Sequence, residues 1–412
     1  MTAIGRAHPA PRTGGASVVV ADDLSGAAEV AAFLGGGTPV LLWPAGTDGL
    51  AGNGSLVLDA DTRGLTPPEA SARTTSILLT LDPFVPTVMK IDSLLRGPIA
   101  ALVAALATPE RVVVVAPALP ALGRTTVDGV VRLGGVPLAE TDAWGAEPVP
   151  PPVGVAAALS PLECVSLGLE RVRGDGLRAD LGSLRGRVVV CDAETVDDLD
   201  RIAAATRRVL PAAAIGASAL CRAFLGNARA AASAPLAQSP RHCLIVVGTA
   251  VPAAVGQVAH LVQETGASEV TPAAGELVTA SGAQITGWRR AIEEALARGD
   301  VVLRFGDRPR GHTPRAAASA LATLVAQCAP VTSGTVDLIL TGGQTARSVL
   351  DALEVERFTI ATEVAPGAII SELPSGALLG TRPGSFGGLD SLLKLRLAMG
   401  PAHPHDPMRS SP

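Results

Sequence analysis

Short β-branched runs alternate with Ala-rich helical stretches along most of this chain, and this alternation restricts the fold more than any other feature. Residues 16–21 (ASVVVA), for example, precede a helical pattern that continues to Leu34. Such alternation is typical of parallel α/β sheets, whose ligands bind beyond the carboxyl ends of the strands. Further strands are predicted near residues 39–43, 55–59, 87–91, 111–116, 187–191, 243–247, 301–304 and 336–341, and helices near 67–80, 97–107 and 314–326.

The 412 residues exceed what one hydrophobic core usually holds, so two domains are expected. Residues 226–241 are small, polar and proline-containing, which is typical of a linker. The predicted organisation is a disordered tail at 1–15, a parallel-sheet α/β domain at 16–228, a linker at 229–241, a second α/β domain at 242–399 and a disordered tail at 400–412.

Composition argues against several classes of function. The net charge is −5 and no stripe of basic and aromatic residues occurs, so no nucleic-acid partner is expected. The five cysteines are dispersed, and we expect reduced, buried thiols rather than a zinc site or disulfides. No apolar run is long enough to span a bilayer and no signal peptide is visible, so we predict a cytoplasmic protein with no membrane partner.

Two adjacent carboxylates follow the first predicted strand. Asp22 and Asp23 lie at a strand-to-helix turn, in the segment ADDLSGA that also contains Ser25. An aspartate at this point could act as a general base toward a substrate hydroxyl, beside the free N–H groups of a helix start. The alternative is that one of the two aspartates only caps the helix.

A second polar segment, KIDSLLRGP, follows the strand near residues 87–91. Lys90, Ser93 and Arg96 are donors suited to a carboxylate or phosphate, with Asp92 to orient them; the alternative is a surface ion pair at an ordinary helix start. Lys90 is one of only two lysines among 33 basic residues, so its retention is informative.

Two more arginines follow strands of this half, Arg63 in the segment DADTRG and Arg124 in the proline-rich segment 117–126, which we expect to be an irregular loop. Arg124 could reach the same site or be solvated. Four strand ends of the N-terminal half thus carry groups suited to a small anionic polyol.

Glycine-rich turns mark the C-terminal half. Gly342 and Gly343 follow a strand and precede a helix, where backbone N–H groups can hold phosphate, although an ordinary tight turn is the alternative. Residues 380–388 (GTRPGSFGG) and 247–250 (VGTA) are similar candidates. The sequence contains no G-x-x-x-x-G-K-[ST] loop, no protein-kinase signature and no G-x-G-x-x-G after a strand.

Taken together, these motifs resemble the four-carbon acid sugar kinase family, whose members phosphorylate threonate, erythronate or 3-oxo-tetronates. The resemblance covers roughly residues 16–395. It rests on ADDLSGA (21–27), DADTRGL (59–65), KIDSLLRG (90–97), APALPALGRTTVDGV (116–130), GGVPLAET (134–141), GT with Gln257 (248–257), TGGQTA (341–346), EVAPG (363–367) and TRPGSFGG (381–388).

The resemblance implies an N-terminal domain that binds the acid sugar and a C-terminal domain that binds ATP with Mg²⁺. The expected partner is a small-molecule sugar acid, and a homodimer is left open. Asp22, Asp23 and Lys90 are expected to be catalytic. The other expected contacts are Ser25, Arg63, Asp92, Ser93, Arg96 and Arg124 for the acid, and Thr249, Gly342, Gly343, Gln344, Thr345, Arg382 and Gly384 for the nucleotide.

The chain departs from the family pattern at several positions. Gln344 stands where Asp is usual, Arg382 where Lys is usual and Pro98 where Asn is usual, and residues 143–153 are degenerate. Pro98 and the altered stretch favour a different hydroxy acid as an alternative substrate. The carboxylate missing at Gln344 favours a second alternative, a sugar-acid sensor without catalysis.

Overall fold

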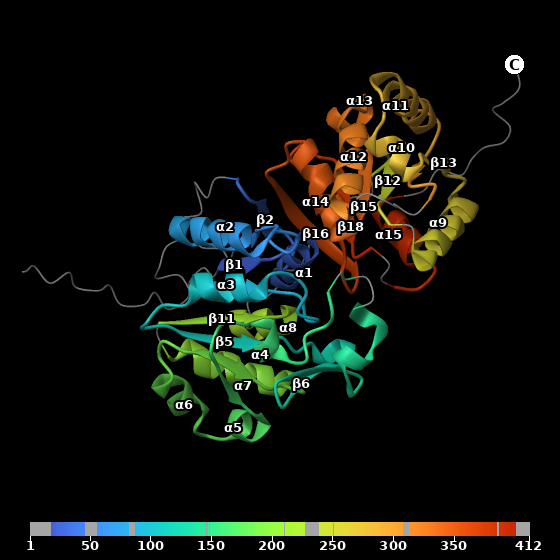
Figure 1. Ribbon diagram of the computed structural model, residues 1–412. Helices are drawn as coiled ribbons and strands as arrows, with labels where there is room; N and C mark the ends of the chain where they lie inside the picture. The colour runs from blue at the N-terminus through green and yellow to red at the C-terminus, as the bar shows by residue number, and fades with distance from the viewer. Residues whose placement is uncertain are drawn as a thin grey trace, which may run out of the picture.

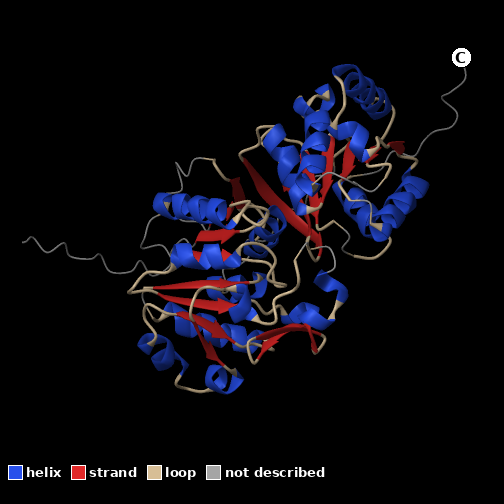
Figure 2. Ribbon diagram, in the orientation of Figure 1, coloured by secondary structure: helices blue, strands red, loops and turns tan. Residues whose placement is uncertain are grey.

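The computed structural model describes residues 18–45, 56–81, 87–144, 147, 149–209, 211–226, 239–249, 251–307, 313–384 and 387–400. The predicted tail at 1–15, most of the predicted linker and the tail after residue 400 lie outside the described residues, so the domain boundaries stay a prediction. Both domains are α/β, with strands enclosed by helices (Figure 2).

The N-terminal domain is built on a parallel sheet with the order β2-β3-β1-β4-β11-β5-β10-β9. Helices α1, α5, α6, α7 and α8 cover one face, and α2, α3 and α4 cover the other. The elements are β1 Val18–Ala21, α1 Leu24–Leu34, β2 Pro39–Leu42, β3 Leu56–Asp59, α2 Pro67–Thr80, β4 Thr87–Lys90, α3 Ile99–Leu106, β5 Val112–Ala116, β6 Arg124–Val127, β7 Val130–Leu133, β8 Val136–Pro137, α4 Val155–Ala158, β9 Cys164–Leu167, α5 Leu169–Arg173, α6 Leu177–Ser183, β10 Val188–Cys191, α7 Val196–Arg207, β11 Ala212–Gly216 and α8 Ser218–Leu225.

The C-terminal domain has the strand order β13-β14-β12-β15-β18-β17-β16, of which β17 and β16 are antiparallel to their neighbours. Helices α10, α11, α12 and α14 pack on one face, and α9 and α15 on the other. The elements are β12 Cys243–Val247, α9 Pro252–Thr265, β13 Ser268–Val270, α10 Ala274–Val278, α11 Gly282–Leu296, β14 Val301–Arg304, α12 Pro314–Ala326, α13 Ala329–Thr332, β15 Asp337–Thr341, α14 Gly343–Ala352, β16 Arg357–Ala365, β17 Ala368–Glu372, β18 Leu378–Arg382 and α15 Ser391–Met399.

The predicted alternation is confirmed, with helices 67–80 and 314–326 and strand 301–304 at the predicted bounds. The segment 117–126 is only partly the irregular loop that was predicted. Its end enters β6, the first strand of a small antiparallel sheet, β6-β7-β8. Left-handed glycines at residues 123, 129 and 134 permit the tight turns around these strands, which is why a Gly- and Pro-rich segment forms a sheet here.

The two domains share one continuous sheet. Strand β16 pairs antiparallel with β2, with Phe358 opposite Val40, so the described residues form one fifteen-stranded sheet that runs through both domains. Figure 1 shows the long β16 reaching from the C-terminal domain toward the N-terminal one. Helix α1 contacts both β16 and α14, and one apolar core continues across the boundary. The start of α1, which carries the predicted aspartates, therefore lies at the domain interface.

Candidate active site

The predicted polar segments of the N-terminal half meet at one edge of the sheet. Strands β3, β1 and β4 are adjacent and parallel, with Ala21 in register with both Asp59 and Lys90. Their carboxyl ends therefore place Asp22, Asp23, Arg63 and the segment after β4 side by side, as the parallel-sheet pattern predicts.

Arg63 joins the two aspartates. Its guanidinium donates to both carboxylate oxygens of Asp22, at 2.9 and 2.8 Å, and to both of Asp23, at 2.5 and 2.8 Å. Burial raises the pKa of the Asp22 carboxyl, and the guanidinium opposes this shift. Burial would lower the pKa of Arg63, but the two carboxylates raise it. Arg63 is thus occupied by protein carboxylates and orders the site.

The two aspartates differ in exposure and in role. The Asp22 side chain is 1% exposed, whereas that of Asp23 is 17% exposed. Asp23 is the N-cap of α1, because its Oδ1 accepts a hydrogen bond of 2.9 Å from the Gly26 N–H. The capping alternative is therefore realised at Asp23, yet this carboxylate is also the one of the pair that a substrate can reach.

Lys90 ends β4 and reaches the same carboxylate. Its Nζ lies 3.9 Å from Oδ1 of Asp23, and its side chain is buried. A Cβ built on Gly26 would come within 2.3 Å of Nζ, so the ammonium fits only because residue 26 is glycine. Burial would lower the pKa of Lys90, but Asp23 and Asp22 raise it, so the ammonium stays charged.

The segment after β4 forms two internal pairs. Asp92 accepts two hydrogen bonds from the Arg96 guanidinium, at 2.6 and 2.9 Å. Burial raises the pKa of Asp92, but these bonds together with the positive charges of Arg63, Arg96 and Lys90 hold it well below its usual range. The predicted orienting role of Asp92 and the ion-pair alternative thus describe the same contact. Arg124, at the start of β6, donates to the Ser93 hydroxyl at 2.6 Å.

The glycine-rich turns of the C-terminal half also meet at one point. Gly342 precedes α14 in a left-handed conformation, and its N–H donates to the Arg382 carbonyl at 2.8 Å. A Cβ on Gly384 would lie 3.6 Å from Thr249 and 3.7 Å from Gly342. Thr345 packs on Gly248, and Gln344 is exposed in the first turn of α14.

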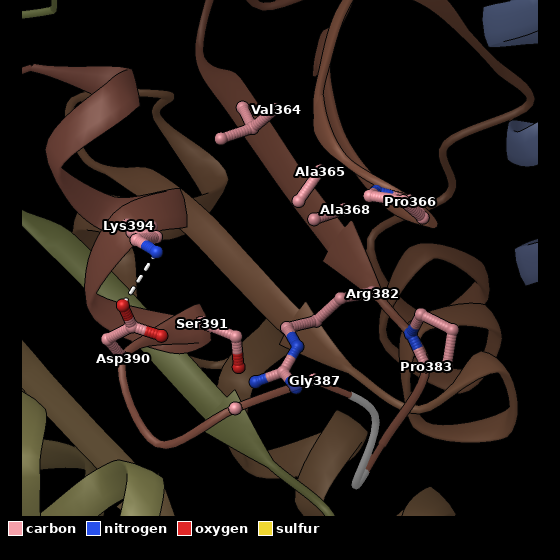
Figure 3. Close-up of a pocket in the computed structure, with 11 residues that line it drawn as sticks. Val364, Ala365, Pro366, Ala368, Arg382, Pro383, Gly387, Asp390, Ser391 and Lys394 are labelled. Atoms are coloured by element: carbon pink, nitrogen blue, oxygen red, sulfur yellow. Dashed lines mark ion pairs between the residues drawn. The ribbon is translucent and has the colours of Figure 1, made fainter.

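The Arg382 side chain extends toward α9 and α15. It donates to Gln257 at 2.8 Å and borders a pocket of about 200 Å³. Figure 3 shows its guanidinium beside Gly387 and Ser391, which also line the pocket. Burial lowers the pKa of Arg382. The pocket is lined by Val364, Ala365, Pro366, Ala368, Arg382, Pro383, Gly387, Gly388, Asp390, Ser391 and Lys394.

The two clusters face each other across the domain boundary. A Cβ built on Gly343, the first residue of α14, would lie 2.9 Å from Oγ of Ser25 and 3.0 Å from Oδ2 of Asp23. The start of α14 therefore abuts the start of α1. Helix N-termini attract anions, so the junction suits the transfer of a phosphoryl group from one domain to a group held by the other.

Three residues of this region are absent from the sequence prediction. Gly26 was within a recognised motif, but only the fold reveals that Lys90 occupies its side-chain space. Asp59 and Arg347 form a buried ion pair of 3.0 Å between the domains. Asp59 belongs to the recognised DADTRG segment, whereas Arg347 carries no local signal.

The described residues contain no cluster of three or more His, Cys, Asp or Glu side chains able to hold a metal ion. Mg²⁺ commonly binds through nucleotide phosphates and only one or two carboxylates. The Asp23 carboxylate, which solvent reaches at the junction, fits Mg²⁺ that enters with a nucleotide substrate.

A parallel-sheet domain with a cationic, carboxylate-rich edge, joined to a domain with glycine turns at a helix start, suits an enzyme that transfers a phosphoryl group to a small acid. A family model described as a sugar-binding N-terminal domain matches residues 17–224, and one described as a nucleotide-binding C-terminal domain matches residues 244–392. The chain belongs to the four-carbon acid sugar kinase family.

Individual relatives agree with this assignment. A D-threonate kinase of Cupriavidus necator is 34% identical over 90% of this chain and 94% of its own length. A D-threonate kinase of Bordetella bronchiseptica is 29% identical over 75% of this chain and 77% of its own. A solved structure from Salmonella typhimurium LT2 is 21% identical, covers 92% of this chain and 98% of its own, and has a TM-score of 0.71, which supports the fold.

The predicted enzyme class, a phosphotransferase with an alcohol group as acceptor, is thus confirmed, which argues against the alternative of a sensor without catalysis. Among the described residues, no helix combines the length and apolar character that crossing a membrane requires. The cytoplasmic location and a homodimer stay predictions.

Proposed function

We propose that this protein uses ATP to phosphorylate a hydroxyl group of a four-carbon sugar acid, with D-threonate as the first candidate and erythronate and 3-oxo-tetronates as the others. The contact of Gly343 with Asp23 and Ser25 carries the proposal, because it brings a phosphate-binding helix start against a reachable carboxylate. The names of the relatives at 34% and 29% identity support threonate.

In this proposal the cationic side chains have different roles in binding the acid. Arg63 and Arg96 are largely occupied by protein carboxylates and order the site. Among the described residues Arg124 donates one hydrogen bond, to Ser93, so further donors of its guanidinium can bind the substrate carboxylate. Lys90 lies beside Asp23, where it can stabilise charge that develops on the reacting oxygen.

The proposed transfer is a direct displacement. Asp23 accepts the proton of the substrate hydroxyl while the oxygen of that hydroxyl bonds to the γ-phosphorus of ATP. The bond between the γ-phosphorus and the oxygen that bridges it to the β-phosphorus breaks, and ADP is released. Backbone N–H groups of the first turn of α14, beginning at Gly343, hold the phosphates. Mg²⁺, entering with ATP as part of the substrate, supplies charge neutralisation on the phosphate oxygens.

A coupled assay of ADP release, with ATP and Mg²⁺ and each four-carbon acid in turn, tests the proposal. We expect turnover that requires both ATP and the acid, with one stereoisomer preferred. Reactions without acid measure background ATP hydrolysis. Absence of turnover on every four-carbon acid, with a protein that still melts cooperatively, would contradict the proposal.

A larger hydroxy acid is a second candidate because of Pro98. Pro98 is the N-cap residue of α3 and follows Gly97, which packs on Arg63. The substitution of Asn by Pro98 therefore lies beside the aspartate clamp, the cluster in which Arg63 binds Asp22 and Asp23. Proline at this position cannot donate a backbone hydrogen bond to a substrate. The same assay with five- and six-carbon hydroxy acids distinguishes the candidates: preference for these acids would favour the second.

A further inference from the structure

Arg347 joins the nucleotide-side helix to the other domain. It lies in the second turn of α14, with its side chain 6% exposed. Its NH1 donates to Oδ2 of Asp59 at 3.0 Å, its NH2 donates to the Trp43 carbonyl, and its Nε donates to Asp351 at 2.8 Å. Asp59 ends β3 and Trp43 follows β2, so the guanidinium ties α14 to two strands of the N-terminal domain.

Asp59 continues this connection toward the aspartate clamp. Its side chain is fully buried at the end of β3, and its Oδ1 accepts a hydrogen bond of 2.9 Å from the Asp61 N–H. Arg63 lies four residues further on, in the same turn, and grips both Asp22 and Asp23. The turn from residue 59 to 63 therefore touches α14 at one end and the proposed base at the other.

A buried ion pair is a poor source of stability, because removing two charges from water costs about as much as their attraction returns. Buried pairs instead favour one arrangement over others, since any displacement leaves a charge unpaired. The shared sheet and apolar core already hold these domains together. The ion pair therefore fixes the orientation of α14 relative to the start of α1.

We infer that Arg347 and Asp59 are positioning residues of the kinase, which align the N-terminal turn of α14 with Asp23 and Ser25. The inference rests on the proposed function. The pair sets the direction from which the phosphoryl group approaches the acceptor hydroxyl, and misplacement by about 1 Å costs about 100-fold in rate.

Steady-state kinetics of Arg347→Met test the inference. We expect kcat to fall about 100-fold, with little change in KM for ATP or the acid, because each domain keeps its own contacts. Arg347→Lys should recover part of kcat, since one charge can still reach Asp59. A double-mutant cycle with Asp59→Asn should show that the two effects are not additive, as for residues in contact.

Arg396→Met is the matched control. Arg396 forms an equally buried pair with Asp300, at 2.7 Å, at the opposite edge of the same domain, where β12 and β14 begin. Its loss should lower the melting temperature of the protein without changing kcat below that temperature. A purely structural role of Arg347 would give the same pattern.

The outcomes separate the two proposals. If the wild type is active and Arg347→Met keeps the wild-type kcat, the positioning role alone is overturned. If Arg347→Met does not fold, an unchanged kcat in Arg347→Lys overturns it instead. A wild type that phosphorylates no hydroxy acid overturns the proposed function and the positioning role with it. A selective loss of kcat that lysine partly restores supports both.

Discussion

The Nζ of Lys90 occupies the space that a side chain on Gly26 would fill, within 2.3 Å of the ideal Cβ position. The same Cβ would lie 2.8 Å from Oδ1 of Asp23. The Lys90 ammonium and the Asp23 carboxylate, from two adjacent strand ends, thus share a volume that only glycine leaves open. Glycine is required in the ADDLSGA motif because its missing side chain leaves space for Lys90 and Asp23, and not because of its backbone conformation.

Gly26→Ala should therefore impair catalysis without unfolding the protein. The added methyl displaces the ends of Lys90 and Asp23, which are flexible side chains, and alanine favours the helix by up to about 1 kcal/mol. We expect kcat/KM to fall by about 100-fold and the melting temperature to change little. Gly287→Ala, in α11 with open space around it, is the control and should retain activity. Full activity of Gly26→Ala would argue against a role for this cluster.

Asp23→Asn separates capping from catalysis. Asparagine caps helices about as well as aspartate, so the stability of α1 should be nearly retained. A general base cannot be replaced by an amide, and we expect kcat to fall at least about 100-fold. Stability is measured by thermal melting and activity by ADP release. An Asp23→Asn enzyme with near wild-type kcat would leave Asp23 as a cap only.

Asp22→Asn is the counterpart to that variant, because Asp22 is the more buried partner of Arg63. Removing one member of a buried ion pair typically costs about 3–5 kcal/mol, and the loss of one acceptor's charge here should approach the lower end. We expect a clear fall in melting temperature, unlike Asp23→Asn. Equal stability of the two variants would contradict this division of roles.

The sequence predicts the site well where local pattern and sheet geometry act together. Strand ends of a parallel sheet meet at one edge, so the segments after β1, β3 and β4 could be placed together without a structure. Helix α2 is also predictable to the residue, because Thr66 and Glu69 form a capping box and prolines occupy its first turn.

The sequence does not predict what depends on contact between the domains. The pairing of β2 with β16 joins segments about three hundred residues apart, and a short apolar strand does not specify its partner. Arg347 lies in an ordinary amphipathic helix pattern, in which an arginine is expected at the surface. Arg347 is buried because it contacts Asp59 on the other domain, and no local sequence pattern predicts that contact.

Gly248→Ala should weaken the nucleotide side of the site. A Cβ on Gly248 would lie 1.9 Å from Oγ1 and 2.9 Å from Cβ of Thr345, whose branched side chain has little freedom to move. The substitution displaces the first turn of α14 and should cost about 1–3 kcal/mol as overpacking. We expect KM for ATP to rise at least about 10-fold while KM for the acid stays unchanged. A change confined to the acid would contradict the assignment of this turn to the nucleotide.

The Asp59 carboxyl gives the domain junction a pH dependence with a definite sign. Burial raises its pKa from 3.8 to about 7, against the attraction of Arg347, while Asp61 adds to the rise. Between these two values the folded protein retains a proton that the unfolded chain has released. The free energy of unfolding contributed by this group therefore falls as pH rises from about 4 to about 7, and is constant above that range.

Thermal melts of the wild type and Asp59→Asn across this pH range check the sign. Asparagine cannot ionise but can still accept a hydrogen bond from Arg347, so the variant lacks the titration and the negative charge that pairs with Arg347. The advantage of the wild type in melting temperature over the variant should shrink as pH rises toward 7 and then level off. Arg347, Asp61 and Asp351 are common to both proteins and cancel in the difference. An advantage that stays constant from about pH 4 to about 7 would mean that Arg347 overcomes burial and that Asp59 is ionised across this range, with a pKa no higher than its usual value.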